Sequence, residues 1–294
     1  MKYFLDTEFL EGTQDKKFLG MKYGETKPTI DLISIGIVAE DGREYYAVSK
    51  DFNLKEAWNR HDIKKDFGKP QGLGDKKVYW IRDNVLKPIY NELIKLEIDN
   101  YKGFTDPYYE LELDFTYKVF KRLIKKYGKT NKQIAKEIKD FCLPSRGFIR
   151  DWYENKNGKI DTTKNFQYLK DYEESFEKEY NNYQNPQFYG YYADYDWVVF
   201  CWLFGKMIDL PSGFPYYCRD LIQMEHEIDS KLSTVMVDTA KIPENVTIEE
   251  YIKMFNPMYL KVKDRKEYPK QTNEHNALAD AIFSNDLYNF LNRI

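Results

Sequence analysis

The sequence predicts an α/β fold in which helices flank a mixed β-sheet, and three observations lead to this prediction. Apolar, β-branched runs open the chain at residues 2–9, 31–38 and 44–48. A further short apolar run at 187–192 leads directly into an apolar segment of helical length. Apolar residues at helical spacing then close the chain at 275–293. Strands that alternate with helices in this way are typical of α/β proteins.

The first three strands are expected to include an antiparallel hairpin. A short turn with the dipeptide Asp41-Gly42 separates the run at 31–38 from the run at 44–48. An Asp-Gly step between two apolar runs is a strong hairpin signal. The run at 2–9 starts apolar and ends on acids, so we expect carboxylates at the end of this strand.

The middle of the chain predicts three helices, at 79–97, 115–127 and 131–142. Pro88 is expected to kink or split the first helix, because proline lacks the N–H of a helical hydrogen bond. A glycine ends the second helix. Thr130, followed three residues later by a glutamine, predicts a capping box at the start of the third.

The second half predicts a helix at 195–205 and a further strand at 216–222. We expect a single domain over residues 1–294. Large insertions are expected in three segments, namely 11–30, 143–185 and 225–270.

Composition narrows the class of protein. The net charge of −3 neither favours nor disfavours a nucleic-acid partner, so phosphate binding would require local basic patches or bound metal. The three cysteines form no CxxC pair, which favours a reduced, cytoplasmic protein over a disulfide scaffold. The longest apolar run, 197–204, is too short to cross a bilayer, and acids near the N-terminus argue against a signal peptide. We therefore expect no membrane partner.

Two acids near the N-terminus are the first candidates for chemistry. Asp6 and Glu8 alternate along a strand, so both carboxylates point to the same side. Their repulsion would raise a pKa unless a divalent cation neutralised them. On its own, such a pair is more often two solvated acids at a strand end.

A third acid stands where the strand at 187–192 gives way to a helix. Carboxylates at such a strand-to-helix switch lie at the edge of the sheet where α/β sites form. Asp196 occupies this place, and Asp194 competes for the role. The alternative for Asp194 is the N-cap of the helix.

A histidine and an acid near the C-terminus complete the candidate set. His275 stands five residues before Asp280, and both are expected to project from the first turns of the last helix. A single histidine is more often a surface or packed residue than a catalyst. Small apolar neighbours such as Ala277 and Ala281 nevertheless indicate a helix start packed closely on the core.

Together these motifs resemble the DEDDh 3′→5′ exonucleases, a superfamily that includes proofreading exonucleases and oligoribonuclease. The matching residues are Asp6, Glu8, Asp196, His275 and Asp280. The related DEDDy branch has a tyrosine four residues before the last acid, where this chain has Asn276. Only the histidine branch therefore fits.

A closer resemblance is to the polyadenylate-specific 3′-exoribonuclease AS family. The similar segments cover about a fifth of the chain and are Tyr3–Phe9, Leu32–Ser49, Trp80–Ile89, Tyr195–Gly205 and His275–Ala281. In this alignment the middle acid falls on Asp196. The three expected insertions have no counterpart of equal length in that family, and they could change the choice of substrate.

The resemblance implies an RNase H-like sheet and two Mg²⁺ or Mn²⁺ ions as cofactors. Asp6 would bridge both ions, Glu8 and Asp280 would complete the first site, and Asp196 would act mainly at the second. His275 would accept the proton of the attacking water, because imidazole is largely neutral and basic at cellular pH. Nucleoside 5′-monophosphates would leave from the 3′ end. The resemblance also implies a homodimer.

Single-stranded nucleic acid is the expected partner, RNA 3′ ends in the first place, with a preference for adenylate tails. Thr7 and Phe9 are the candidate substrate contacts beside the acids, although Phe9 could equally be a core residue. The lysines of 118–139 could follow phosphates or could form a solvated helix face. A single-stranded DNA exonuclease and an inactive nucleic-acid-binding module remain the alternative functions, because the sequence does not reveal contacts to the 2′-OH.

Overall fold

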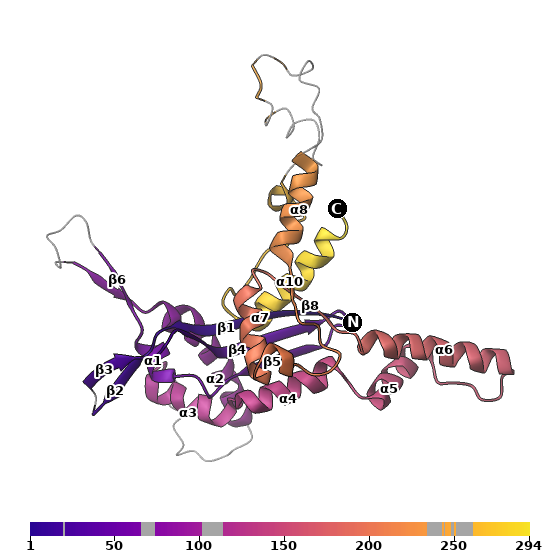
Figure 1. The fold of residues 1–294 in the computed structure, drawn as a ribbon, viewed down its shortest axis with the longest axis horizontal. Coiled ribbons are helices and arrows are strands. Elements are labelled where there is room, and N and C mark those ends of the chain that lie inside the picture. Colours follow the sequence, from indigo (N-terminus) through magenta and orange to yellow (C-terminus); the bar gives the residue numbers. More distant parts are fainter. Residues whose placement is uncertain are drawn as a thin grey trace.

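The computed structural model describes residues 1–19, 21–65, 74–101, 114–233 and 261–294, together with a few positions between 243 and 250. Within these residues the chain is mixed α/β, with helices on both faces of a five-stranded sheet of order β5-β4-β1-β8-β9 (Figure 1). The predicted α/β class with a mixed, helix-flanked sheet is confirmed.

Three antiparallel strands form one half of the sheet. They are β1 (Lys2–Gly12), β4 (Thr29–Ala39) and β5 (Glu44–Val48), and each contains its predicted segment. The Asp41-Gly42 turn joins β4 to β5 as predicted, and Gly42 takes a φ of 88°, which a residue with a Cβ rarely adopts. A register shift between Glu8 and Phe9 marks a bulge in the β1–β4 pair.

Two short parallel strands form the other half. β8 (Gln187–Gly190) lies beside β1 and is two residues shorter than predicted, and β9 (Arg219–Asp220) lies beside β8. The strand predicted over 216–222 is present at Arg219–Asp220, and the prediction is wrong for the other residues of that range. The side chain of Asp220 accepts the N–H of Ile222 at 3.0 Å, and this contact starts helix α8 (Leu221–Ser233) instead.

The two faces of the sheet carry different helices. Tyr3 and Leu5 of β1 are buried on the face that packs against α7 (Asp194–Phe204) and α4 (Asn131–Cys142). Phe4 is buried on the opposite face, against α10 (Ala277–Leu291). Asp6 and Glu8 follow Phe4 by strand alternation, so their carboxylates belong to the α10 face.

The helices predicted in the middle of the chain are present. A π-helical turn, η1 (Arg82–Leu86), continues into α2 (Lys87–Tyr101), so the irregularity expected near Pro88 occurs just before it. α3 (Tyr117–Tyr127) ends at Gly128, and α4 begins with the predicted capping box of Thr130 and Gln133.

The segments expected as insertions contain regular structure. β1 and β4 extend into 11–30, where β2 (Asp15–Phe18) and β3 (Met21–Glu25) form a hairpin. Two helices that the sequence did not predict, α5 (Arg146–Asn157) and α6 (Phe166–Tyr183), pack together within 143–185. About half of the segment 225–270 lies outside the described residues, and the end of α8 belongs to its described part.

Further elements extend from the two ends of the sheet. α1 (Leu54–Asn59) precedes a second hairpin, formed by β6 (Asp62–Lys64) and β7 (Lys76–Val78). Figure 1 shows the β2–β3 and β6–β7 hairpins at one end of the molecule and the α5–α6 pair at the other. β1 runs from the N-terminus, near α6, toward the end with the hairpins.

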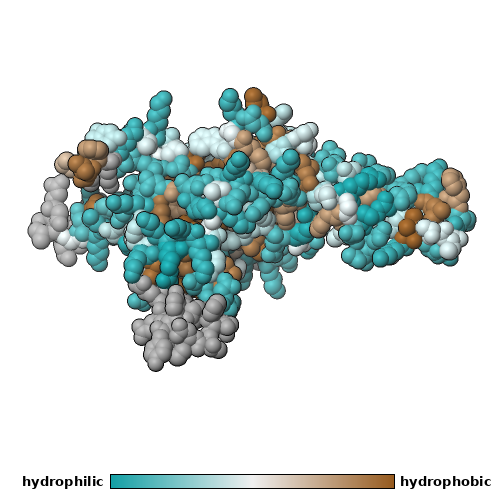
Figure 2. Space-filling view, turned by 90° about the horizontal axis from the view of Figure 1, so that it is seen from below, coloured by the Kyte–Doolittle hydropathy of each residue, from teal (hydrophilic) through white to brown (hydrophobic). Residues whose placement is uncertain are grey.

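The face of the molecule seen from below in the orientation of Figure 1 is mainly polar. Figure 2 shows a largely hydrophilic face on which hydrophobic residues form small, separated groups. Among the helices of the described ranges, none combines the length and the hydropathy that a bilayer crossing requires.

Candidate active site

Three of the predicted acids meet at one place. Asp6 and Glu8 come from β1, and Asp280 comes from the first turn of α10. One carboxylate oxygen from each lies within 4.8 Å of the others. The group therefore unites the two ends of the sequence.

A glycine permits this contact between helix and sheet. Gly36 of β4 is the register partner of Asp6. A Cβ at Gly36 would lie 2.3 Å from the carbonyl oxygen of Ala277 and 2.4 Å from the Cα of Leu278. Because both are backbone atoms, only glycine lets the start of α10 approach β4 so closely.

The electrostatics of the group are unfavourable without a counter-charge. Within the described residues, the carboxylates of Asp6 and Glu8 accept no hydrogen bond. Burial, and then the neighbouring carboxylates Asp196, Glu8 and Asp280, raise the pKa of Asp6 well above its ordinary value. Burial, followed by Asp280 and Asp196, raises the pKa of Glu8 to about 8. A divalent cation would relieve both the burial cost and the repulsion.

Asp280 is held more firmly than the other two acids. Its carboxylate accepts the side-chain N–H of Gln271 at 2.5 Å and the backbone N–H of His275 at 3.0 Å. Burial raises the pKa of Asp280, and these two hydrogen bonds oppose the rise. Two well-placed donors therefore orient the carboxylate that α10 contributes to this group.

The start of α10 differs from the sequence prediction. The helix begins at Ala277, and Asn276 caps it by accepting the N–H of Ala279 at 3.0 Å. Asn276 also donates to Glu92 of α2 at 2.6 Å. His275 therefore does not project from the first turn as predicted, because it precedes the cap and takes a left-handed φ of 65°.

His275 nevertheless lies beside the carboxylates. Its Nδ1 is 4.0 Å from Oε1 of Glu8. Its ring meets the ring of Trp80 edge-on, with centroids 4.8 Å apart. The side chain is 39% exposed, so water can reach the imidazole.

Asp196, the fourth predicted acid, is buried next to the group. Its Oδ1 accepts both the backbone N–H of Thr7 at 2.9 Å and the hydroxyl of Thr7 at 2.5 Å. Burial raises the pKa of Asp196 to about 6, although the bonds from Thr7 oppose the rise. Asp196 lies outside the three-carboxylate group of Asp6, Glu8 and Asp280. Its charge still raises the pKa of two members.

Asp194 is not the helix cap that the sequence suggested. The N-cap of α7 is Ala193, and the cap makes no side-chain hydrogen bond. Asp194 is the first residue of the helix and is exposed, whereas Asp196 is 6% exposed. Only Asp196 faces the other acids.

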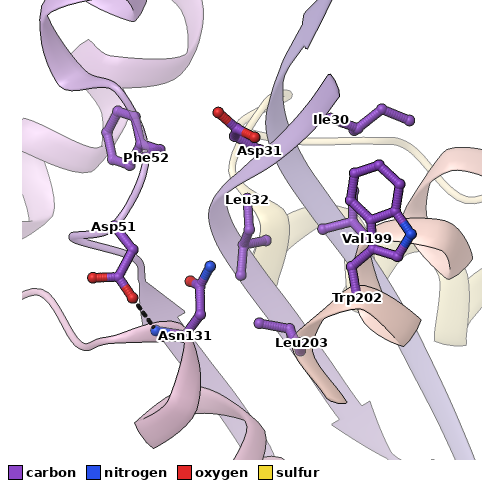
Figure 3. Close-up of a pocket in the computed structure, with 9 residues that line it drawn as sticks. All are labelled: Ile30, Asp31, Leu32, Asp51, Phe52, Asn131, Val199, Trp202 and Leu203. Carbon is purple, nitrogen blue, oxygen red and sulfur yellow. Dashed lines mark hydrogen bonds between the residues drawn. The ribbon is translucent and has the colours of Figure 1, made fainter. Parts of the chain in front are cut away.

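Phe9 is half-buried on the α7 face, with its ring 5.9 Å from the ring of Tyr195. Its ladder partner Leu32 lines a cavity of about 230 Å³ that Phe9 itself does not line. Figure 3 shows Asp51 and Phe52 on one wall of this cavity and residues of α7, including Trp202, on the other. None of the five predicted catalytic residues lines it, so cavity and carboxylates are separate features.

The basic stretch at 118–139 lies on α3 and α4. Two of its lysines pair with acids among the described residues. Lys126 is 2.6 Å from Glu97, and Lys129 is 2.5 Å from Glu137. A role of this surface in following phosphates stays a prediction.

Three polar residues around the acids were not predicted from the sequence. Asp220, at the end of β9, raises the pKa of Asp196 by its charge. The sequence signal for Asp220 was an acid one residue after the short apolar run Tyr216–Cys218. Gln271 donates a hydrogen bond to Asp280, and Asn276 caps the helix that carries Asp280. Asn276 could have been recognised from the sequence as a cap residue before an apolar helix.

Comparison with known proteins gives one line of similarity. The chain is 51% identical over 65 residues to proteins named 3'-5' exoribonuclease from two strains of Mycobacterium tuberculosis, CDC 1551 / Oshkosh and H37Rv. This similarity covers 21% of the chain and 30% of each relative. The chain thus spans about a third of the length of these curated relatives. No protein-family model matches the chain.

Proposed function

We propose that this protein is a metal-dependent 3′→5′ exoribonuclease with an RNase H-like fold. The observation that carries the proposal is the group of Asp6, Glu8 and Asp280, two of which have no hydrogen-bond donor among the described residues. The local similarity to proteins named 3'-5' exoribonuclease supports RNA as the substrate.

The donor set fits a hard divalent cation. Three carboxylates within 4.8 Å offer only oxygen ligands, which Mg²⁺ and Mn²⁺ prefer. Among the described residues, no lysine or arginine pairs with these carboxylates, so their charge is available to an ion. We propose that Asp6, Glu8 and Asp280 hold one ion and that Asp6 and Asp196 contribute to a second.

Two bound ions would polarise the attacking water and stabilise the leaving 3′ oxygen. His275, beside Glu8 and open to solvent, accepts the proton of that water. Gln271 and the backbone of His275 fix the carboxylate of Asp280. Thr7 fixes Asp196 through two hydrogen bonds, so it acts as a positioning residue in addition to its predicted contact with substrate.

Phe9 is proposed to contact the base at the 3′ end. It lies one residue beyond Glu8 on the opposite face of β1, and its side chain is partly exposed. The proposal includes a preference for adenylate at the 3′ end of the RNA, which the experiment below measures.

A single labelled-substrate experiment tests the activity. The protein and Mn²⁺ are incubated with 5′-labelled RNA and DNA of equal sequence, and with oligoadenylate and oligouridylate of equal length. Ladders that shorten from the 3′ end and release nucleoside 5′-monophosphates are expected for RNA. Asp6→Asn serves as the matched inactive control.

The outcomes separate the candidate functions. Faster degradation of DNA than of RNA would identify a single-stranded DNA exonuclease. Intact ladders in every lane, with the protein folded and Mn²⁺ bound, would contradict nuclease activity altogether. Equal rates on oligoadenylate and oligouridylate would remove the adenylate preference alone.

A further inference from the structure

The β6–β7 hairpin carries an unusual concentration of unpaired positive charge. Its described lysines are Lys64, Lys65, Lys76 and Lys77, and all four are exposed. In the part of the chain that the structure describes, none of the four is paired with an acid, in contrast to Lys126 of α3 and Lys129, which lies between α3 and α4. Two acids, Asp62 and Asp75, flank the strands and leave the hairpin net positive.

The register of the hairpin places like charges together. Lys64 of β6 is the direct cross-strand partner of Lys76 of β7. Side chains in such positions have Cβ atoms about 5 Å apart, and like charges there are destabilising. A two-stranded hairpin is marginally stable in water, and the repulsion between these two lysines lowers the stability of the hairpin further. An anionic ligand would remove the cost.

The base of the hairpin is fixed next to the candidate active site. The ring of Tyr79, which follows β7, lies 3.9 Å below the guanidinium of Arg82 and 5.3 Å from the ring of His61, which precedes β6. Trp80 comes next and has its ring 4.8 Å from that of His275.

A single strand of nucleic acid is long enough to contact both the hairpin lysines and the candidate active site. The four residues from Lys76 to Trp80 span at most about 14 Å when extended. This length corresponds to roughly four nucleotides at about 3.4 Å for each stacked step.

We propose that the β6–β7 hairpin is a phosphate-binding arm for single-stranded RNA on the 5′ side of the scissile bond, an inference that rests on the proposed function. The repeated charges of a nucleic-acid backbone match four lysines on one short hairpin. The arm holds the RNA by its phosphates, independently of sequence, while the 3′ end reaches the carboxylates.

Salt dependence of binding tests the arm. A 12-nucleotide RNA with a 5′ fluorophore is titrated with protein in EDTA, which prevents cleavage, and anisotropy is read from 50 to 200 mM NaCl. Each phosphate contact to a single strand contributes about 0.7 to the slope of log K against log salt. Changing all four hairpin lysines to glutamine should reduce the slope by about 3. Wild-type affinity should therefore fall roughly 50-fold more than that of the variant over this salt range.

Two variants serve as controls. Lys159, Lys164, Lys170 and Lys178, which are exposed at the α5–α6 end, are changed to glutamine and should leave the slope at the wild-type value. Changing the four hairpin lysines to arginine keeps the charge and should retain the slope. Melting temperatures confirm that each variant is folded.

The possible results are decisive. The proposed RNA-binding role of the hairpin is overturned if the hairpin glutamine variant keeps the wild-type salt slope. It is also overturned if the α5–α6 glutamine variant loses as much of the salt slope as the hairpin variant does. If the wild-type protein degrades RNA while the slope is unchanged, only this inference fails. If it degrades no RNA yet the slope still falls, the proposed function fails and the arm remains a nucleic-acid-binding surface.

Discussion

Gly36→Ala should damage the candidate active site without changing any candidate catalytic residue. The new methyl group would lie 2.3 Å from the carbonyl oxygen of Ala277, whereas ordinary contacts begin at 3.4 Å. The start of α10 and β4 must therefore separate by about 1 Å, because neither backbone can rotate away as a side chain would. Asp280 moves with α10 while Asp6 stays on β1, so the carboxylate group opens.

The expected losses follow from these distances. Overpacking of this kind costs about 1–3 kcal/mol of unfolding free energy, and each kcal/mol lowers Tm by about 2–4 °C in a protein of this size class. A misplacement of about 1 Å in a catalytic group can cost about 100-fold in rate. Hydrolysis of 5′-labelled RNA with Mn²⁺ and a thermal melt measure both quantities.

Gly24→Ala is the matched control, because a Cβ at Gly24 meets nothing within 4 Å. It should retain wild-type kcat/KM and Tm. If Gly36→Ala hydrolysed RNA within about twofold of the wild-type rate, the close packing of α10 on β4 would not be what assembles the site.

Four further predictions concern single side chains. Asp6→Ala should abolish Mn²⁺ binding in calorimetry while Tm is kept, because the change removes a partly buried carboxylate that its neighbours repel; undiminished Mn²⁺ binding would contradict the ligand assignment. Asp196→Asn should remove activity, whereas Asp194→Asn should change neither rate nor Tm noticeably, since Asp194 is exposed and caps nothing; the reverse ranking of rates would refute this. His275→Ala should lower kcat by roughly 10²–10⁴-fold and remove the acid limb of the pH–rate profile while Mn²⁺ binding persists, and near-normal kcat in the folded variant would exclude the general base. In EDTA, Tm should fall as the pH rises from about 4.5 to about 8, because the raised pKa of Glu8 makes folding favour its protonated form. The contribution of protonated Glu8 to folding stability is complete below the ordinary pKa of the carboxyl group and is lost above the raised pKa. Glu8→Gln should flatten this dependence and excess Mn²⁺ should oppose it, so a pH-independent wild-type Tm in EDTA would show that Glu8 is not repelled.

Sequence patterns predicted the regular parts of the fold well. The alternation in β1, the Asp41-Gly42 turn and the capping box at Thr130 each depend on residues close together in the chain, and all three are present. The strand predicted at 216–222 failed because one side chain, Asp220, favours a helix start over continued pairing.

Helices α5 and α6 were missed for a different reason. Their buried faces use aromatic residues such as Tyr172, Phe176 and Tyr183 within a strongly polar sequence, so the apolar period is hidden by hydroxyl groups and flanking charges. The segment looked irregular because tyrosine counts as both polar and buried.

The candidate site was likewise predicted in part from the sequence. The residue types at positions 6, 8, 196, 275 and 280 pointed to one chemistry, and the structure brings three of these acids within 4.8 Å. The donors that orient them could not be predicted, because Gln271 and Thr7 act through tertiary contacts. The left-handed backbone of His275 likewise depends on how the chain enters α10.

The distance in sequence between Asp6 and Asp280 has a consequence for synthesis of the protein. A ribosome adds about 5–20 residues per second, so roughly 15–55 s separate the appearance of the first carboxylate from that of the last. Until α10 has emerged and packed on Gly36, the acids of β1 have no partner from the C-terminal end. A nascent chain therefore lacks the complete site until α10 has been made and packed, and products truncated before α10 lack it permanently.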